Sequence, residues 1–302
     1  MARPQPDTIV QMLRSQPNRP ENLTPEETRA GFETMTQMLQ VKDDTKRETT
    51  SANGVPGAWI TNDASSDATT IYYLHGGGYS IGSVNTHATM ISQIARASTA
   101  RAFAVDYRLA PEHPFPAALD DALAGYRWLL AQGIDAKSIV IGGDSAGGGL
   151  AAALLLAIRD EGEAMPAGAV LLSPWTDLTG SGESQKTRAN LDPMIPAFEG
   201  VSPMALWYIG NGSGTDPLIS PLFAELHGLP PILIHVGDHE VLLSDSTRFA
   251  EKAKAAGVDV TLKVWDEMIH VFQFFPMLPE GQQAIAEIGE WVRSKIAIKA
   301  AA

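Results

Sequence analysis

Gly143-Asp144-Ser145-Ala146-Gly147 is the stretch that decides the fold of this chain. A short apolar run, Ser138 to Ile141, precedes it, and a longer one, Leu150 to Ile158, follows it. This order predicts a buried strand, a sharp turn and a buried helix. A serine at such a turn is held on a strained backbone, with its hydroxyl over the end of a sheet. Ser145 is therefore a candidate nucleophile.

The residues around Ser145 suit that turn. A side chain at position 143 or 147 would collide with the neighbouring strand or helix. The amide of Ala146 would point at whatever the hydroxyl attacks, with the positive end of a helix behind it. G-x-S-x-G alone also occurs in loops that merely join a strand to a helix. The interpretation therefore depends on whether an acid and a histidine follow in that order.

Upstream, the apolar and aromatic run Ile71 to Leu74 leads into His75-Gly76-Gly77-Gly78. Bare backbone amides can approach a developing oxyanion there, because no Cβ blocks the way. Neither glycine cluster has the G-x-G-x-x-G spacing or the Gly-Lys-Ser/Thr ending of a phosphate-binding loop. We expect His75 to hydrogen-bond this loop rather than to act as a base.

Two further strands predict the rest of the site. Pro231 to Val236 leads into Gly237-Asp238-His239-Glu240, and Val260 to Trp265 is followed by His270. Each polar group lies just beyond a strand, where an open α/β sheet places its ligand crevice. A serine hydroxyl needs an adjacent base, so His270 is the candidate, and a carboxylate must orient it. The alternative for His270 is a buried histidine that packs beside Phe272.

Together these segments resemble the bacterial branch of the hormone-sensitive-lipase-like α/β-hydrolase esterases. The resemblance covers nearly the whole chain and is carried by His75–Gly78, Asp106-Tyr-Arg-Leu-Ala-Pro-Glu112, Phe115–Ala117, Gly143–Gly148, Ser173–Asp177 and His270–Phe272. It implies an α/β-hydrolase fold: an eight-stranded, mostly parallel sheet flanked by helices, with a helical cap. It also implies that the protein needs no metal or organic cofactor.

The resemblance also assigns roles. Ser145 would be the nucleophile and His270 the general base, with Gly77, Gly78 and Ala146 supplying the oxyanion amides. The implied reaction is hydrolysis of short-chain acyl esters through an acyl-enzyme. The same site could instead open lactones or cleave carbamates or amides. A non-catalytic receptor on a hydrolase fold is the alternative from another class, but such receptors lose the histidine.

The acid of the triad departs from the commonest residue of the family, which is an Asp three residues after the glycine that ends its strand. Counting from Gly237, that position is Glu240, followed by Val241-Leu242. Asp and Glu both serve in this fold. Glutamate is one methylene longer, so its loop must lie slightly farther back. Asp238 remains the alternative acid.

Four segments are expected along the chain: N-terminal cap helices (1–50), the first part of the hydrolase core (51–178), a cap insertion (179–214) and the second part of the core (215–302). Thr24-Pro25-Glu26-Glu27 and Ser202-Pro203 are typical helix starts. A cap rich in methionine and aromatic residues would offer adaptable apolar walls to an acyl chain. Candidate wall residues are Phe32, Trp207 and Tyr208, and packing onto the sheet is the alternative role.

Two local patterns are interpreted as structural. The Asp106 to Glu112 segment is charged and follows a strand, and we expect Arg108 and Glu112 to pair and fix that loop. His235 and His239 have the spacing of metal ligands. Such pairs belong on one helix face, however, and these straddle a strand end, so we expect no metal site.

Composition limits the partners. The net charge of −13 disfavours nucleic acid and anionic membranes, and there is no cysteine for disulfide or thiol chemistry. Residues 1–10 lack an apolar signal core, and the Leu150–Ile158 run is too short to span a bilayer, so cytoplasmic residence is the default expectation. The expected partner is a small-molecule ester. A homodimer is also possible through the edge strand near Val260–Trp265.

Overall fold

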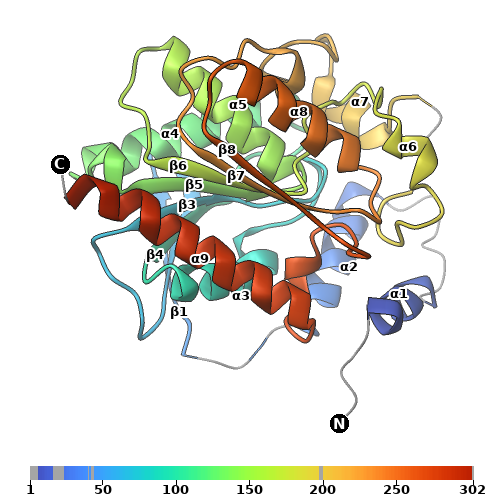
Figure 1. Cartoon of the computed structure of the whole chain (residues 1–302), viewed down its shortest axis with the longest axis horizontal. Helices are drawn as coiled ribbons and strands as arrows, with labels where there is room; N and C mark the ends of the chain where they lie inside the picture. Colours follow the sequence, from blue (N-terminus) through green and yellow to red (C-terminus); the bar gives the residue numbers. More distant parts are fainter. Residues whose placement is uncertain (1–5, 16–23, 40, 42–43, 197–199, 301–302) are drawn as a thin grey trace.

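A single sheet runs through the part of the chain that the computed structural model describes, residues 6–15, 24–39, 41, 44–196 and 200–300. Its strand order is β1-β2-β4-β3-β5-β6-β7-β8 (Figure 1). The strands are β1 (Lys46–Ala52), β2 (Val55–Thr61), β3 (Thr70–Leu74), β4 (Arg101–Val105), β5 (Ile139–Asp144), β6 (Gly168–Leu172), β7 (Ile232–Gly237) and β8 (Val260–Trp265). Strand β2 is antiparallel to both of its neighbours, and all other pairs are parallel. The predicted eight-stranded, mostly parallel sheet is confirmed.

Helices cover both faces of the sheet (Figure 1). One face carries α3 (Val84–Ala97) and α9 (Pro279–Ala300), and the other carries α4 (Ala117–Ala131), α5 (Ala146–Asp160) and α8 (Leu243–Ala255). Every residue of β3 is buried, and its side chains alternate between the two faces. Ile71 and Tyr73 pack on the α3 side, whereas Tyr72 and Leu74 pack on the α5 side. A central parallel strand is expected to be apolar on both faces for this reason.

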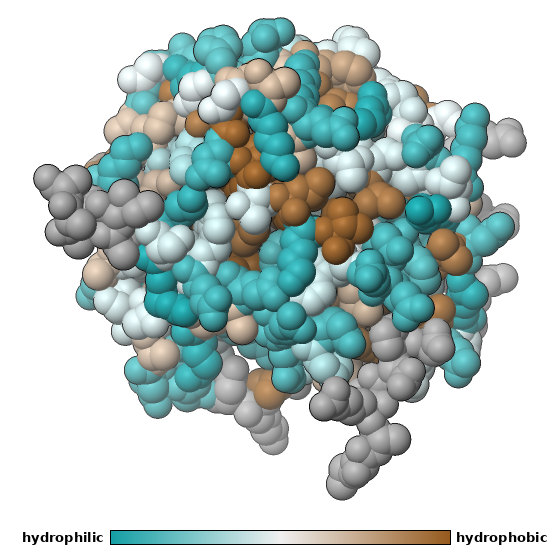
Figure 2. Space-filling view, in the orientation of Figure 1, coloured by the Kyte–Doolittle hydropathy of each residue, from teal (hydrophilic) through white to brown (hydrophobic). Residues whose placement is uncertain are grey.

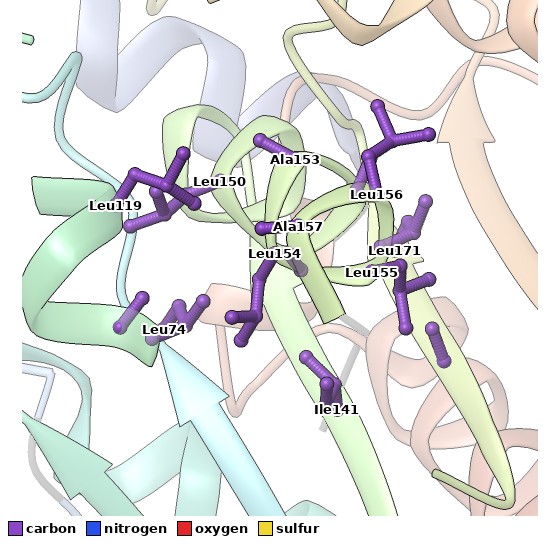
Figure 3. Packing of buried hydrophobic residues seen from close by; sticks show 14 of the residues in the cluster. Leu74, Leu119, Ile141, Leu150, Ala153, Leu154, Leu155, Leu156, Ala157 and Leu171 are labelled. Carbon is purple, nitrogen blue, oxygen red and sulfur yellow. The ribbon is translucent and has the colours of Figure 1, made fainter. Parts of the chain in front are cut away.

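Helix α5, which begins directly after Ser145, forms the centre of the core. Its leucines, including Leu150 and Leu154, pack beside Leu74, Ile141 and Leu171 from β3, β5 and β6 (Figure 3). Full burial of each such side chain contributes roughly 1.5–3 kcal/mol. The turn that carries the candidate nucleophile therefore leads directly into a fully packed core helix.

Four helices gather at one end of the sheet: α1 (Pro6–Arg14), α2 (Pro25–Gln37), α6 (Ser184–Thr187) and α7 (Pro203–Ile209) (Figure 1). The two predicted helix starts are confirmed. Thr24 and Glu27 form a reciprocal capping box at α2, and Ser202 caps α7 with Pro203 in its first turn. The 3₁₀ turns η1 (Ala136–Ser138), η2 (Pro221–Phe223) and η3 (Phe272–Phe274) complete the regular elements of the described residues.

The expected N-terminal helical segment is too long at its end. Residues from Lys46 to Ala52 form β1, which pairs antiparallel with β2. The two strands are joined by Asn53-Gly54, whose φ angles are +52° and +91°. Asn-Gly is the preferred tight hairpin turn because both residues tolerate positive φ. In the sequence, Asn53-Gly54 is therefore the feature that indicates a hairpin and hence a strand before it.

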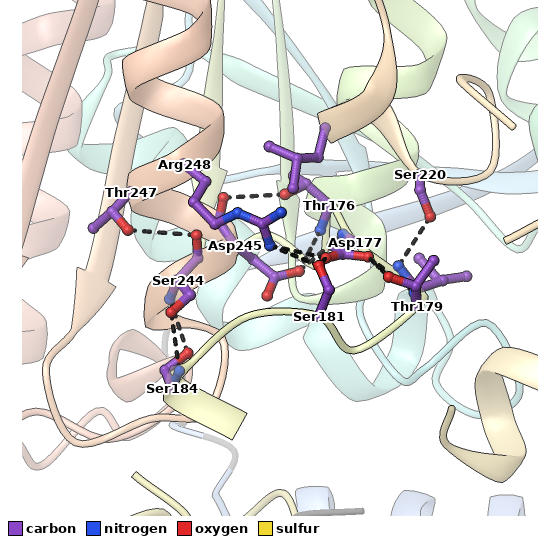
Figure 4. Close-up of polar contacts among 12 residues, drawn as sticks. Thr176, Asp177, Thr179, Ser181, Ser184, Ser220, Ser244, Asp245, Thr247 and Arg248 are labelled. Atoms are coloured by element: carbon purple, nitrogen blue, oxygen red, sulfur yellow. Dashed lines mark hydrogen bonds and ion pairs between the residues drawn. The ribbon is translucent and has the colours of Figure 1, made fainter. Parts of the chain in front are cut away.

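A buried polar network fixes the start of the 179–214 insertion to α8 (Figure 4). The amides of Thr176 and Asp177 donate to Asp245 Oδ1 at 3.0 and 2.9 Å. Arg248 Nη1 lies 2.9 Å from Asp177 Oδ2. Burial and the charge of Asp177 raise the pKa of Asp245 well above its ordinary value. The segment that follows β6 is thus held in place where the insertion begins.

Candidate active site

Ser145 occupies the strained turn that the sequence predicts. Its φ and ψ are +53° and −122°, a region that non-glycine residues rarely adopt. Its amide donates to Leu172 O at 2.8 Å, and its carbonyl accepts from the amide of Trp175 at 2.9 Å. The hydroxyl makes no capping hydrogen bond to α5. The backbone of Ser145 is therefore held on both sides, while its hydroxyl is not used to cap α5.

The glycines that flank Ser145 are required by close backbone approaches. A Cβ on Gly143 would lie 2.2 Å from the carbonyl oxygen of Gly147. A Cβ on Gly147 would lie 2.1 Å from the carbonyl oxygen of Leu74, on the neighbouring strand β3. Real Cβ atoms do not come so close to backbone oxygen. The steric expectation from the sequence is confirmed at both positions.

The glycine loop after β3 lies beside this turn. Gly77 and Gly78 both have positive φ, +117° and +60°, and the carbonyl of Gly77 accepts from the amides of Ser80 and Ile81. Among the described residues, no protein acceptor takes the amide hydrogens of Gly77 and Gly78. Ala146 is the first residue of α5, so its amide has no partner within the helix either. Three donors are thus available for an oxyanion.

His270 and Glu240 meet in the same region. His270 Nδ1 lies 2.7 Å from Glu240 Oε2, and both side chains are buried. The other carboxylate oxygen of Glu240 accepts from the amide of Gly237 at 2.6 Å and from Ser173 Oγ at 2.8 Å. With its acceptors satisfied and its charge aimed at the imidazole, Glu240 fixes the tautomer that carries hydrogen on Nδ1.

The two halves of the candidate triad are attached to one dipeptide at the end of β6. Ser145 donates its amide to Leu172 O, and Val271, the residue after His270, donates its amide to Ser173 Oγ at 3.2 Å. Ser173 is fully buried and has a φ of +45°. The sequence pattern assigns no role to Ser173 beyond its place in the resembling Ser173–Asp177 segment. Its contact with Glu240 and Val271 became visible only in the fold.

Glu240 controls the protonation of His270. Burial lowers the pKa of His270, but the hydrogen bond and charge of Glu240 outweigh this effect, and more distant help comes from Asp192 and Asp144. The net result is a pKa raised above the ordinary histidine value. A raised pKa suits a base that must take a proton and hold it during the reaction.

Asp238 lies elsewhere. Its Oδ1 accepts from the amide of Glu267 at 2.6 Å, and its carbonyl accepts from Arg188 Nε at 2.8 Å. A third of its side chain is exposed, and no contact joins it to His270 among the described residues. The residue that supports the acid loop is instead Asp192 of the insertion, whose Oδ2 accepts from the amide of Val241 at 3.0 Å. No sequence motif pointed to Asp192, because it lies 49 residues away from its partner.

A buried cluster lies behind the glycine loop. Asp144 Oδ1 accepts from Tyr73 Oη at 2.9 Å and from the amide of Gly76 at 3.1 Å, and its Oδ2 lies 3.3 Å from His87 Nε2. His75 accepts a hydrogen bond from Tyr107 on its carbonyl, and burial lowers the pKa of its ring to about 3. His75 is therefore neutral, in agreement with the expected structural role.

The expected ion pair in the loop after β4 is wrong. Arg108 and Glu112 do not pair: Arg108 binds Asp121 of α4, and Glu112 binds Arg29 of α2. The Asp106–Glu112 segment is held from two helices because its charged side chains point to opposite sides.

His235 and His239, whose spacing resembles that of metal ligands, lie in different surroundings. His235 is buried in β7, whereas His239 lies beyond it and is one-third exposed. In the described parts of the chain, no three acidic or histidine side chains are grouped as a metal site.

The candidate wall residues have different environments. Tyr208 is buried, with its ring stacked on that of Tyr79 at a centroid distance of 3.6 Å. Trp207, the next residue back along α7, is 39% exposed and faces outward. Phe32 is half-buried beside Phe274, with ring centroids 6.4 Å apart. Helical spacing alone could not tell which side of α7 faces the sheet.

Met204 of α7 lies against Gly78 of the glycine loop. A Cβ on Gly78 would lie only 2.4 Å from the sulfur of Met204. The thioether therefore lies directly over the loop whose amides are free. This contact brings α7 of the insertion onto the candidate active site.

Across the part of the chain that the structure describes, the helices are too short or too polar to span a bilayer.

Comparison with known proteins places this chain among the α/β hydrolases. A family model for the α/β-hydrolase fold matches residues 71–274. An acetyl-hydrolase from Streptomyces hygroscopicus is 43% identical over 237 residues, which are 78% of this chain and 79% of that protein. An esterase from the bacterial hormone-sensitive lipase family has a crystal structure with a TM-score of 0.93 at 49% identity, covering 98% of this chain and 100% of that chain.

A crystal structure of EstE5 soaked with p-nitrophenyl butyrate has a TM-score of 0.92 at 46% identity, again covering 98% of this chain and 100% of that one. The similarity to these proteins, in sequence and in fold, therefore extends along almost the whole chain. The chain belongs to the α/β-hydrolase fold family, in its bacterial hormone-sensitive-lipase branch.

Proposed function

We propose that this carboxylic ester hydrolase acts on short-chain acyl esters through an acyl-enzyme on Ser145, with His270 as general base and Glu240 as the orienting acid. The observation that carries the proposal is the 2.7 Å contact of His270 Nδ1 with Glu240, at the strand ends where Ser145 forms its strained turn. Asp238 lacks any comparable contact. The family supplies the reaction class, and the geometry of the site supports the roles.

The reaction would proceed in two steps. His270 Nε2 takes the proton of the Ser145 hydroxyl as its oxygen attacks the ester carbonyl, and Glu240 stabilises the imidazolium that forms. The free amides of Gly77, Gly78 and Ala146 hold the oxyanion. His270 then protonates the leaving alcohol. In the second step water, deprotonated by His270, attacks the acyl-enzyme and releases the acid.

Burial of the site makes these interactions stronger than they would be in water. Ser145 and His270 are only 8% and 5% exposed. In a water-excluded site, oriented amide dipoles stabilise developing charge far better than mobile solvent does. Met204 and α7 provide the cover over the oxyanion loop. The site is thus built for a substrate whose acyl group is small enough to fit beneath the cap.

Two similarities favour short acyl groups. The Streptomyces relative is named for the acetyl group, and EstE5 was soaked with a butyrate ester. In this chain the sulfur of Met204 lies against Gly78, so α7 leaves little room above the glycine loop. We therefore infer a preference for acyl groups of about two to six carbons.

A panel of p-nitrophenyl esters from acetate to dodecanoate tests this preference. We expect kcat/KM to peak at six carbons or fewer and to fall about tenfold or more by twelve, since each extra methylene must find room under the cap. Lactones, carbamates and anilides measured in the same assay separate the alternative reactions. A maximum at twelve carbons, or faster turnover of an amide than of its ester, would contradict the proposal.

Reaction with an organophosphonate tests the catalytic role itself. We expect one equivalent of label on Ser145, found by mass spectrometry of the digested protein, and none in a Ser145→Ala variant. A protein that binds esters without labelling would belong to the receptor class instead.

We also propose that the chain forms a homodimer through β8. Strand β8 is the last strand of the sheet, and its outer edge has no partner among the described residues. Apolar surface gathers over this strand in the space-filling view (Figure 2), and Val264 is 40% exposed. An edge strand with unpaired backbone groups and an exposed apolar side chain such as Val264 offers a second copy both hydrogen bonds and buried area.

Light scattering behind size-exclusion chromatography tests the dimer. We expect the mass of two chains at micromolar concentration, and a shift to one chain in Val264→Glu, because a carboxylate would be buried without a partner. Met277→Glu places the same charge on another exposed apolar residue and should leave the dimer intact. A wild-type protein that stays monomeric at 100 µM or so would rule out this interface.

A further inference from the structure

Helix α2 contacts the glycine loop through an unusually well-paired arginine. Arg29 Nε donates to Ser80 O at 2.9 Å, and Nη2 donates to Ala110 O at 3.0 Å. The same guanidinium binds both oxygens of Glu112 at 2.9 and 2.6 Å. Two of its four bonds therefore go to backbone carbonyls, one of which lies inside the glycine loop.

A second residue of α2 holds the other end of that loop. Glu33 accepts from Ser83 Oγ with one carboxylate oxygen and from Asn85 Nδ2 at 2.6 Å with the other. Ser83 is the N-cap of α3, where the glycine loop ends. Arg29 and Glu33 are four residues apart, so they share one face of α2. Helix α2 thus contacts the loop at Ser80 and again at Ser83, where the loop ends.

The oxyanion-loop glycines lie just before these contacts, in a segment with an uncommon backbone conformation. Gly77, Gly78 and Tyr79 all have positive φ, and the amides of Ser80 and Ile81 donate to Gly77 O within this segment. The amide of Ala110 donates to Tyr79 O at 2.9 Å, so Arg29 closes a ring that joins residues 79–80 to residue 110. Oxyanion stabilisation depends on donors that are oriented before the reaction begins. Because the amide of Ser80 itself donates to Gly77 O at 3.0 Å, a contact that holds Ser80 O restrains the turn that begins at Gly77.

We propose that Arg29 and Glu33 are positioning residues for the oxyanion hole, so that α2 of the cap is part of the catalytic apparatus without touching the substrate. This inference rests on the proposed function, because it assumes that the amides of Gly77 and Gly78 hold an oxyanion. The hydrogen bonds from Arg29 lower the pKa of Glu112 to about 2. The forked geometry, with four acceptors for one guanidinium, is specific to arginine.

A purely structural role for Arg29 predicts a different outcome. In that case its loss would lower the melting temperature and leave the chemistry of the folded protein unchanged. A positioning role predicts that the variant loses stabilisation of the transition state while its binding of the substrate stays the same. The two are separated by measuring kcat, KM and the affinity of a trifluoromethyl ketone, which binds Ser145 as a tetrahedral adduct with its oxygen in the oxyanion hole.

We expect Arg29→Gln to lower kcat about tenfold, less than the roughly 100- to 1,000-fold loss caused by removing an oxyanion donor outright. KM should change less than about threefold, and the ketone inhibition constant should rise by about the same factor as kcat/KM falls. Arg29→Lys keeps the charge but not the fork, so it should recover only part of the loss. Glu33→Gln should show the same pattern more weakly, because its amide retains one acceptor.

Arg127→Gln is the matched control. Arg127 also binds two carboxylates, Glu161 and Glu163, but it contacts neither the glycine loop nor the triad. It should match wild type in kcat and in ketone affinity. Equal kcat and ketone affinity in Arg29→Gln, with only a lower melting temperature, would overturn the proposal.

Hydrogen exchange gives a readout that needs no turnover. The amides of Ser80 and Ile81, which donate to Gly77 O, should exchange faster in Arg29→Gln than in wild type or Arg127→Gln. Unchanged exchange would refute the positioning role even if activity fell. A wild-type protein that neither labels at Ser145 nor turns over esters would defeat the proposed function, while the exchange comparison would still decide whether Arg29 holds the loop.

Discussion

Replacing Ser145 with alanine is expected to lower kcat for p-nitrophenyl acetate by about four to six orders of magnitude. The oxygen that forms the acyl-enzyme is then missing, and no neighbouring group of the described site can replace it as a nucleophile. Any residual rate would come from water attacking an ester that the oxyanion amides still polarise. The substitution should hardly change stability, because the hydroxyl caps no helix and alanine suffers the same backbone strain at φ +53°.

The measurement is a steady-state rate on protein whose melting temperature has been shown to match wild type. Ser246→Ala serves as the control, since it removes another buried serine hydroxyl, one with no hydrogen-bond partner on α8. That variant should keep full activity. Turnover within about tenfold of wild type in Ser145→Ala would show that a different residue attacks the ester.

The fold followed from the sequence wherever one element decides its own environment. The run from Leu150 to Ile158 has no polar residue, so only a helix buried in the core could contain it, and this is where α5 lies. Strand β1 was missed because its side chains are nearly all exposed and show no alternation. Its stability comes from pairing with β2, a contact that the local hydrophobic pattern does not encode.

Site residues divide in the same way. Ser145, Gly77 and Gly78 lie in short motifs whose backbone geometry requires those residue types, so spacing alone could indicate them. The hydrogen bonds of Ser173 and Arg29 depend instead on how distant elements pack. Charge and spacing suggested a pair between Arg108 and Glu112, but each side chain found a partner on a helix more than ten residues away. Such pairings are set by the tertiary structure and not by the local sequence.

The second large effect concerns the acid. We expect Glu240→Gln to lower kcat by about three to four orders of magnitude, and Asp238→Asn to change it less than about threefold. The glutamine is nearly isosteric, yet its amide nitrogen cannot accept a hydrogen bond, so either the His270 contact or the bonds from Gly237 and Ser173 must be lost. Asparagine at position 238 can still accept from the amide of Glu267.

The pH dependence of kcat/KM distinguishes this role from a structural one. His270 must be neutral to act as a base, so the rate rises with pH through its pKa, which Glu240 holds above the ordinary value of about 6.5. In Glu240→Gln the effect of burial remains and the opposing charge is gone, so the pKa of His270 falls. The midpoint of the rise should therefore move to lower pH as the maximum rate drops. A variant that loses activity with its midpoint unchanged, or an Asp238→Asn variant that loses more than Glu240→Gln, would place the acid elsewhere.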